Sequence, residues 1–188
     1  MQPAVLLEQC APAIAPVTMA AIVQQESGGN PLALHDNTTG KSYTPGTMAE
    51  VARRARELIG QGHSVDIGLA QINSRNLQRL GVGIKQALEP CENLRAAQAV
   101  LLDGWMRSGD LRATLSAYNT GKLRSPVGAA YGAQVFGKAG VTVPAIPGGQ
   151  LARWAAAGAT LSPVQPVVTW TPAASPLSPT GDGLTARW

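Results

Sequence analysis

One acidic residue, Glu26, continues an apolar helical stripe in the sequence. Met19, Ile22 and Val23 follow helical spacing, and three more residues along the same stripe lead to Glu26. A carboxyl group on a buried helix face loses the hydration of its charged form, so its pKa should rise. An acid that stays protonated near neutral pH can protonate the oxygen of a glycosidic bond. The alternative is a solvent-exposed place in the last helical turn.

Amide side chains suited to sugar binding follow later in the chain. Residues 66–73 read Asp-Ile-Gly-Leu-Ala-Gln-Ile-Asn, and an extended backbone there sends Gln71 and Asn73 to the same side. Each amide offers both a donor and an acceptor, which matches the hydroxyl and N-acetyl groups of a sugar. The alternative is that both amides cap turns.

A second polar segment ends a predicted helix. Residues 117–121 read Ala-Tyr-Asn-Thr-Gly and place Tyr118 and Asn119 before a helix-ending glycine. Beside Glu26, the hydroxyl of Ser27 could orient the carboxyl group. Taken singly, Tyr118 and Tyr131 are more typical of core aromatics than of site residues.

Helical patterns cover most of residues 1–139, so the sequence predicts a mainly α domain with a short irregular or β segment near residues 63–73. A stop signal, Ser-Gly-Gly-Asn-Pro, follows Glu26, and Thr47 with Glu50 forms a capping box. Three predicted helices cover residues 12–26, 74–80 and 91–108. Three more are predicted to start at residues 47, 110 and 125. In the last of these, Val127, Tyr131 and Val135 are expected on one inward face.

The composition changes from residue 140 onward. Residues 140–188 are rich in Pro, Ala, Thr and Gly and poor in charge, so they cannot bury enough surface to offset their ordering entropy. We expect a disordered C-terminal tail, in which Trp154, Trp170 and Trp188 are either docking points for a partner or scattered aromatics.

Charge and hydropathy exclude several function classes. The net charge is +4, and the arginines are scattered without the dense basic run of a nucleic-acid-binding protein. These arginines either lie on solvent-exposed helix faces or attract an acidic polymer. No apolar run is long enough for a membrane span. Residues 1–16 lack the basic start and long apolar stretch of a signal peptide, so an export signal is not evident.

Metal binding is not expected, because His35 and His63 are far apart and no Cys-x-x-Cys pair exists. We expect no cofactor. Cys10 and Cys91 each adjoin a predicted helix start, and they are either buried thiols or one disulfide.

Taken together, the motifs resemble the soluble lytic transglycosylase domain, which has a lysozyme-like fold. Glu-Ser, Gly-Leu-x-Gln-Ile-Asn, Ala-Tyr-Asn-x-Gly and an isolated Tyr occur in the family's order over residues 22–135. The VirB-type branch, associated with type IV secretion and conjugation, is the most similar. It shares Cys-Ala-Pro at Cys10, the Asp before Gly-Leu at Asp66, and Pro-Cys-Glu-Asn-Leu from Pro90.

The resemblance implies a role for each matching residue. Glu26 is the sole catalytic acid and base, Ser27 holds its carboxyl group, and Tyr131 bonds to it from a facing helix. The saccharide is bound by four residues, two lining its subsites and two shaping the cleft floor: Gln71 and Asn73, then Tyr118 and Asn119. Many family members have Met where this chain has Ala70, which predicts a looser subsite there.

The implied activity is cleavage of bacterial peptidoglycan between N-acetylmuramic acid and N-acetylglucosamine, with formation of a 1,6-anhydro sugar. Glycan strands are the implied partner, in the periplasm, and the tail is expected to contact secretion components. An oxidising periplasm and the shared cysteines favour a Cys10–Cys91 disulfide. Two alternatives remain: a hydrolytic muramidase that uses Asp36 or Asp66 to activate water, and a peptidoglycan-binding assembly factor without catalysis.

Overall fold

The computed structural model describes residues 3–140 of the chain. The predicted tail, with Trp154, Trp170 and Trp188, lies outside the described residues from 141 onward. The domain is mainly α-helical with one small antiparallel sheet, which confirms the predicted fold class.

The N-terminal segment forms two helices, α1 (Pro3–Cys10) and α2 (Pro16–Glu26), so the prediction of one helix over residues 12–26 was wrong at its start. Proline has no N–H to offer an earlier turn, and Pro16 accordingly occupies the first turn of α2. The connection is held by the backbone N–H of Ala13, which donates to Oε1 of Gln98 at 2.7 Å.

A disulfide joins Cys10 to Cys91, with a Cα–Cα distance of 5.1 Å. Cys10 ends α1, while Cys91 lies in the first turn of α6 (Pro90–Ser108). The bridge therefore joins one helix end to one helix start, where we had expected two helix starts. Both sulfur atoms are thereby fixed beside the central helix α6.

Four short strands form an antiparallel sheet in the order β2-β1-β3-β4. β3 (Val65–Ile67) and β4 (Ile72–Asn73) lie in the segment predicted to be irregular or extended. β1 (Leu34–Asp36) and β2 (Lys41–Tyr43) were not predicted, because three residues are too few to show a period. His35 pairs with Asp66 across β1 and β3, which brings β3 against the end of the loop after α2.

The helices after the first two strands include one with an explicit capping box and three short helical segments. The capping box of α3 (Met48–Gly60) forms as predicted, since Glu50 N–H donates to Oγ1 of Thr47 and Thr47 N–H donates to Glu50. A 3-10 turn, η1 (Ser74–Asn76), leads into α4 (Leu77–Leu80), and the short α5 (Ile84–Leu88) was not predicted.

Close packing of α7 (Leu111–Thr120) and α8 (Pro126–Lys138) requires a glycine. A Cβ on Gly128 would lie 2.2 Å from Oγ of Ser116 and 2.6 Å from its Cα. The inward face of α8 is formed by Gly128, Tyr131, Gly132 and Val135. Val127, predicted on that face, is 68% exposed. In an α-helix, side chains four residues apart point in directions that differ by about 40°, so a row of such residues turns away from the buried face.

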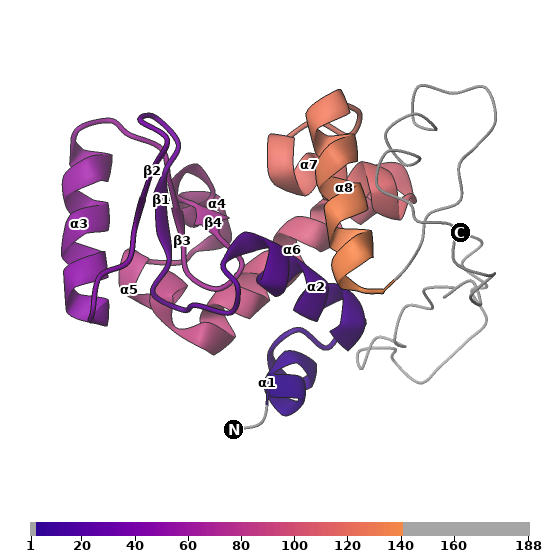
Figure 1. Ribbon diagram of the computed structural model, residues 1–188, viewed down its shortest axis with the longest axis horizontal. Helices are drawn as coiled ribbons and strands as arrows, with labels where there is room; N and C mark the ends of the chain where they lie inside the picture. Colours follow the sequence, from indigo (N-terminus) through magenta and orange to yellow (C-terminus); the bar gives the residue numbers. More distant parts are fainter. Residues whose placement is uncertain (1–2, 141–188) are drawn as a thin grey trace, which may run out of the picture.

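Figure 1 shows the sheet with α3 on one side of the molecule, and α1, α2, α7 and α8 on the other, with α6 running between them. The core includes the buried face of α2, with Met19 and Ile22 fully covered, and Leu94 and Leu101 of α6. No helix in the described part of the chain is both long and apolar enough to cross a membrane.

Candidate active site

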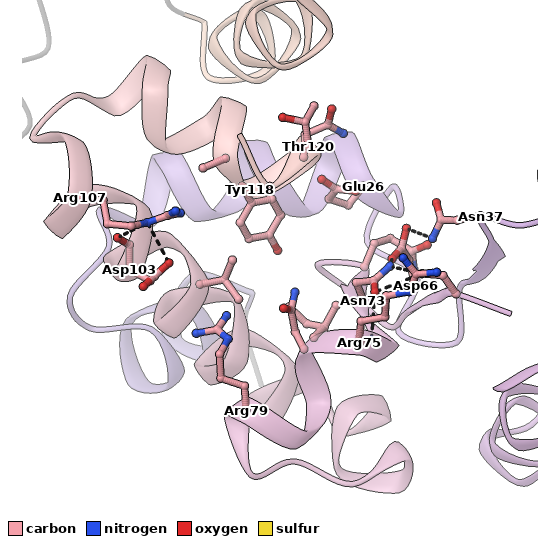
Figure 2. Close-up of a pocket in the computed structure, with 18 residues that line it drawn as sticks. Glu26, Asn37, Asp66, Asn73, Arg75, Arg79, Asp103, Arg107, Tyr118 and Thr120 are labelled. Atoms are coloured by element: carbon pink, nitrogen blue, oxygen red, sulfur yellow. Dashed lines mark hydrogen bonds and ion pairs between the residues drawn. The ribbon is translucent and has the colours of Figure 1, made fainter. Parts of the chain in front are cut away.

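A cleft of about 570 Å³ contains most of the predicted site residues. Its lining includes the end of α2, the turn between β3 and β4, the start of η1 and the end of α7. The predicted residues on this lining are Glu26, Asp66, Gln71, Asn73, Tyr118 and Asn119. In Figure 2, Glu26 lies between Tyr118 and the pair of Asp66 and Asn73.

Glu26 is a half-buried acid at the last position of α2. Burial is the main cause that raises its pKa, and the negative charge of Asp66 adds to it. A hydrogen bond from Tyr131 acts in the opposite direction, and the balance raises the pKa of Glu26 to about 7. Near neutral pH the carboxyl group can therefore both give and take a proton.

Two tyrosines enclose this carboxyl group. The hydroxyl of Tyr131 on α8 donates to Oε1 of Glu26 at 2.5 Å, from behind the cleft lining. Tyr118 stacks on Tyr131 with ring centroids 6.4 Å apart, and its hydroxyl donates to the carbonyl of Ala70 at 2.6 Å. Burial is the main cause that raises the pKa of both phenols, so both remain proton donors.

Ser27 does not hold the Glu26 carboxyl group, which corrects the role expected from the resemblance. Its hydroxyl bonds to the carbonyl of Leu69 at 2.6 Å, and it accepts a bond from the N–H of Gly29. Leu69 belongs to the turn between β3 and β4. Ser27 thus ties the end of α2, and with it Glu26, to this turn.

Gln71 lies on the cleft lining but its amide also holds the turn. Its Nε2 donates to the carbonyls of Gly68 and Ala33 at 2.8 and 3.2 Å. Gln71 has a φ of 47°, and it is the one non-glycine residue with positive φ in the described chain. Such a conformation persists where surrounding bonds fix it, and it occurs often at functional sites.

Asn93 on α6 supports the same turn and was missed as a functional candidate. It is fully buried, its Oδ1 accepts from the N–H of Ala70, and its Nδ2 donates to the carbonyls of Ile67 and Ala87. A Cβ on Gly68, whose φ is 80°, would lie 2.4 Å from that Nδ2. A polar residue on the apolar face of the predicted helix was the available signal.

The side chain of Ala70 is fully buried and lies outside the cleft lining. The alanine side chain therefore does not itself shape a subsite, and the looser subsite expected from the missing methionine stays a prediction. Its backbone contributes instead, since its N–H donates to Asn93 and its carbonyl accepts from Tyr118.

Asn73 and Asp66 form one hydrogen-bonded unit on the cleft wall. Nδ2 of Asn73 donates to Asp66 at 2.6 Å, and its Oδ1 accepts from the N–H of Arg75, which caps η1. Asn37 donates to the other oxygen of Asp66 at 2.8 Å. Burial, the largest influence, raises the pKa of Asp66 despite these two bonds. The turn-capping alternative for Asn73 is therefore part of its role.

Asp36 lies away from the cleft and is completely buried. Burial alone would raise its pKa, but hydrogen bonds from Thr39, His63 and Thr38 outweigh it and lower the pKa of Asp36 to about 2. An acid so strongly held as a carboxylate, and so fully enclosed, cannot activate water for the cleft. Asp36 is a structural residue that joins β1 to the end of the loop after α3.

Asn119 and the absence of a metal-binding cluster among the described residues complete the description of the cleft. Asn119 is exposed on the lining at the end of α7, where its amide is open to a ligand. Between residues 3 and 140, no three His, Cys, Asp or Glu side chains gather closely enough to hold a metal ion. The arrangement thus offers one acid of near-neutral pKa beside a wall of amides and hydroxyls, which suits protonation of an ether oxygen in a carbohydrate.

Comparison with known proteins agrees with this geometry. The family described as "Transglycosylase SLT domain" matches residues 4–131. A protein of Agrobacterium fabrum named "Protein virB1" is 44% identical over 121 residues, which cover 60% of this chain and 49% of that protein.

A protein of Brucella abortus named "Type IV secretion system protein virB1" is 38% identical over 128 residues, covering 63% of this chain and 54% of that protein. The chain thus spans about half the length of the curated relatives it matches. No solved structure matches significantly.

Proposed function

This chain belongs to the transglycosylase SLT domain family, and on that premise we propose that it is a lytic transglycosylase that cleaves bacterial peptidoglycan. The observation that carries the proposal is Glu26, a half-buried acid with a pKa raised to about 7 that lines a cleft of polar side chains. We assign this activity to a catalytic domain formed by residues 1–139.

In the first proposed step, protonated Glu26 donates its proton to the oxygen between N-acetylmuramic acid and N-acetylglucosamine. The glycosidic bond breaks, and the N-acetyl group of the muramic acid stabilises the positive charge on its own ring. Glu26 becomes a carboxylate, which the hydroxyl of Tyr131 stabilises through its hydrogen bond. One carboxyl group is sufficient for this step.

In the second proposed step, ionised Glu26 removes the proton of the 6-hydroxyl group of the same muramic acid. The freed oxygen attacks the anomeric carbon and closes a 1,6-anhydro ring, which leaves Glu26 protonated for the next cycle. Because both reacting groups belong to one bound sugar, the step is intramolecular and competes well with water. The amides of Gln71 and Asn119 on the cleft lining are the proposed sugar contacts.

A hydrolytic muramidase is the second candidate, and one observation favours it. Asp66 lines the same cleft as Glu26 and is near enough to influence its pKa. Such an aspartate could activate a water molecule, as the second carboxylate of a hydrolase does. Both of its oxygens already accept amide hydrogen bonds, from Asn37 and Asn73, which favours a supporting role instead.

Mass spectrometry of the products released from purified cell walls tests the two candidates. A transglycosylase leaves 1,6-anhydromuramic acid ends. A hydrolase leaves reducing ends, which are heavier by the mass of one water molecule. The Glu26→Gln variant should bind cell walls, retain its helical circular dichroism spectrum and release neither product. An inactive wild-type protein that still pellets with cell walls would favour a non-catalytic binding function.

We further propose that the cleavage opens the cell wall locally for a type IV secretion or conjugation apparatus, in the periplasm. The name of the Brucella abortus relative, a type IV secretion system protein, supports this context. The tail, residues 140–188, is the proposed contact for secretion components. A pull-down of such components with the full chain, compared with residues 1–139 alone, tests that contact.

A further inference from the structure

Two arginines from consecutive helical segments line the cleft, and Figure 2 shows Arg75 beside Asp66 and Asn73. Arg75 lies in η1 and Arg79 in α4, four residues apart, and both side chains are exposed to the cleft. Figure 2 shows Arg79 directed from α4 toward the side of the cleft where Asp103 and Arg107 lie. The proposed chemistry at Glu26 uses neither arginine.

Neither Arg75 nor Arg79 forms a side-chain ion pair with any other residue in the described chain. The third arginine of the lining differs, because Nε of Arg107 lies 3.2 Å from the carboxylate of Asp103. The lining carries three arginines and three acids, Glu26, Asp66 and Asp103, and among the described residues Arg107 is the arginine of the lining that has an ion-pair partner. Arg75 and Arg79 therefore keep positive charges that can meet an anionic ligand.

Both arginines carry their charge into the cleft without an ion-pair partner in the described chain. An anion that enters the cleft beside them can accept charge-assisted hydrogen bonds, which guanidinium groups make well to carboxylates. A solvated helix face explains an arginine outside a cleft, but two unpaired cations on its lining favour an anionic ligand.

We propose that Arg75 and Arg79 bind a carboxylate of the muramic acid substituent, either the free lactyl group or the stem peptide attached to it. The inference rests on the proposed function, and it deepens it by naming which substrate groups decide affinity. Strands rich in such carboxylates bind more tightly than uncharged N-acetylglucosamine chains. Specificity for the bacterial polymer then arises at these two arginines, while bond cleavage takes place at Glu26.

The carboxylate can come from two sources, and three ligands distinguish them. Glycan fragments with stem peptides carry their carboxylates on the peptides, since the lactyl group is then in an amide bond. Amidase-treated fragments have lost the peptides and carry free lactyl carboxylates. Oligomers of N-acetylglucosamine have neither group and measure the contribution of the sugar ring contacts alone.

The test is a calorimetric titration of each ligand into the full chain carrying Glu26→Gln, which keeps the ligand intact. Adding Arg75→Gln and Arg79→Gln should weaken binding of an anionic ligand about tenfold, or about 1.4 kcal/mol. Binding of the uncharged oligomer should stay unchanged. The loss should shrink at high salt, because exposed charges are screened.

A matched control removes the same charge elsewhere. Arg53→Gln with Arg56→Gln alters two exposed arginines of α3, which lie outside the cleft lining, and should not change the affinity for any ligand. A loss only with peptide-bearing strands assigns the stem peptide, and a loss only with amidase-treated strands assigns the lactyl group.

Two results would overturn the inference alone while the parent Glu26→Gln chain still binds. One is an equal loss for all three ligands, and the other is no loss for either anionic ligand. If the parent chain binds none of the three ligands, the proposed function fails, and this inference fails with it. Product analysis of the wild-type chain remains independent of all these outcomes.

Discussion

The hydroxyl of Tyr131 donates a hydrogen bond to the carboxyl group of Glu26, across 105 residues of chain. The contact exists because α8 packs against α2. It lowers the pKa of Glu26, while burial and the charge of Asp66 raise it. Because these influences oppose each other, single substitutions should be able to raise or to lower the pKa of Glu26.

Tyr131→Phe should raise the pKa of Glu26 above its value of about 7. The carboxyl group loses the bond that favours its charged form, so the alkaline limb of the pH profile of kcat/KM should move to higher pH. The rate should fall about 10- to 100-fold, as expected for losing one hydrogen bond to a charged group. Tyr43→Phe, outside the cleft, is the control, and an unmoved limb would contradict the assignment.

Asp66→Asn should move the alkaline limb of the pH profile of kcat/KM to lower pH. Removing a nearby negative charge stabilises ionised Glu26, so its pKa falls and activity is lost at lower pH. A transglycosylase should keep a substantial rate and its anhydro product, whereas a hydrolase that depends on Asp66 should lose nearly all activity. Asp103→Asn, on the opposite wall, serves as the comparison. A rise of the limb would disprove the electrostatic coupling.

Asn93→Asp should destabilise the fold by about 2 to 4 kcal/mol. Aspartate has the same size, but its oxygens cannot donate to the carbonyls of Ile67 and Ala87, which are then left without their donor. Urea unfolding measures the change in the free energy of unfolding. Asn119→Asp, at an exposed position, should stay within about 0.5 kcal/mol of wild type. Similar stability of both variants would refute the role of Asn93.

Removing the disulfide should cost about 4 kcal/mol of unfolding free energy. The bridge closes a loop with a sequence separation of 81, and a cross-link over such a loop lowers the entropy of the unfolded chain by about that amount. The variant Cys10→Ala with Cys91→Ala should unfold at lower denaturant concentration, and reduced wild type should behave like it. Unfolding midpoints that do not respond to reduction would argue against the bridge.

The helical part of the fold followed from the sequence where periods were long and caps were explicit. Thr47 and Glu50 defined the start of α3, and the buried stripe through Met19 and Ile22 led correctly toward Glu26. The sheet could not be predicted in full, because β1 and β2 are held by pairing with each other and with β3, which is information between segments.

The site was predictable as a set of residues but less so as a set of contacts. The resemblance brought Glu26, Gln71 and Tyr118 to one cleft, as their places on its lining show. It misassigned Ser27, because a hydroxyl next to Glu26 in sequence can turn toward the carbonyl of Leu69 instead. Asn93 was missed since its partners are backbone atoms far away in the chain.

Gly128 precedes Tyr131 by three residues, and the space beside it is already filled by Ser116 of α7. Any side chain at this position would force α7 and α8 to shift relative to each other, and α8 is the helix that carries the Tyr131 phenol to Glu26. The position of the Tyr131 phenol thus depends on the absence of a side chain at Gly128, about one helical turn earlier. A residue without a side chain, which is not part of the cleft lining, thereby helps to set the position of the hydrogen bond that lowers the pKa of Glu26.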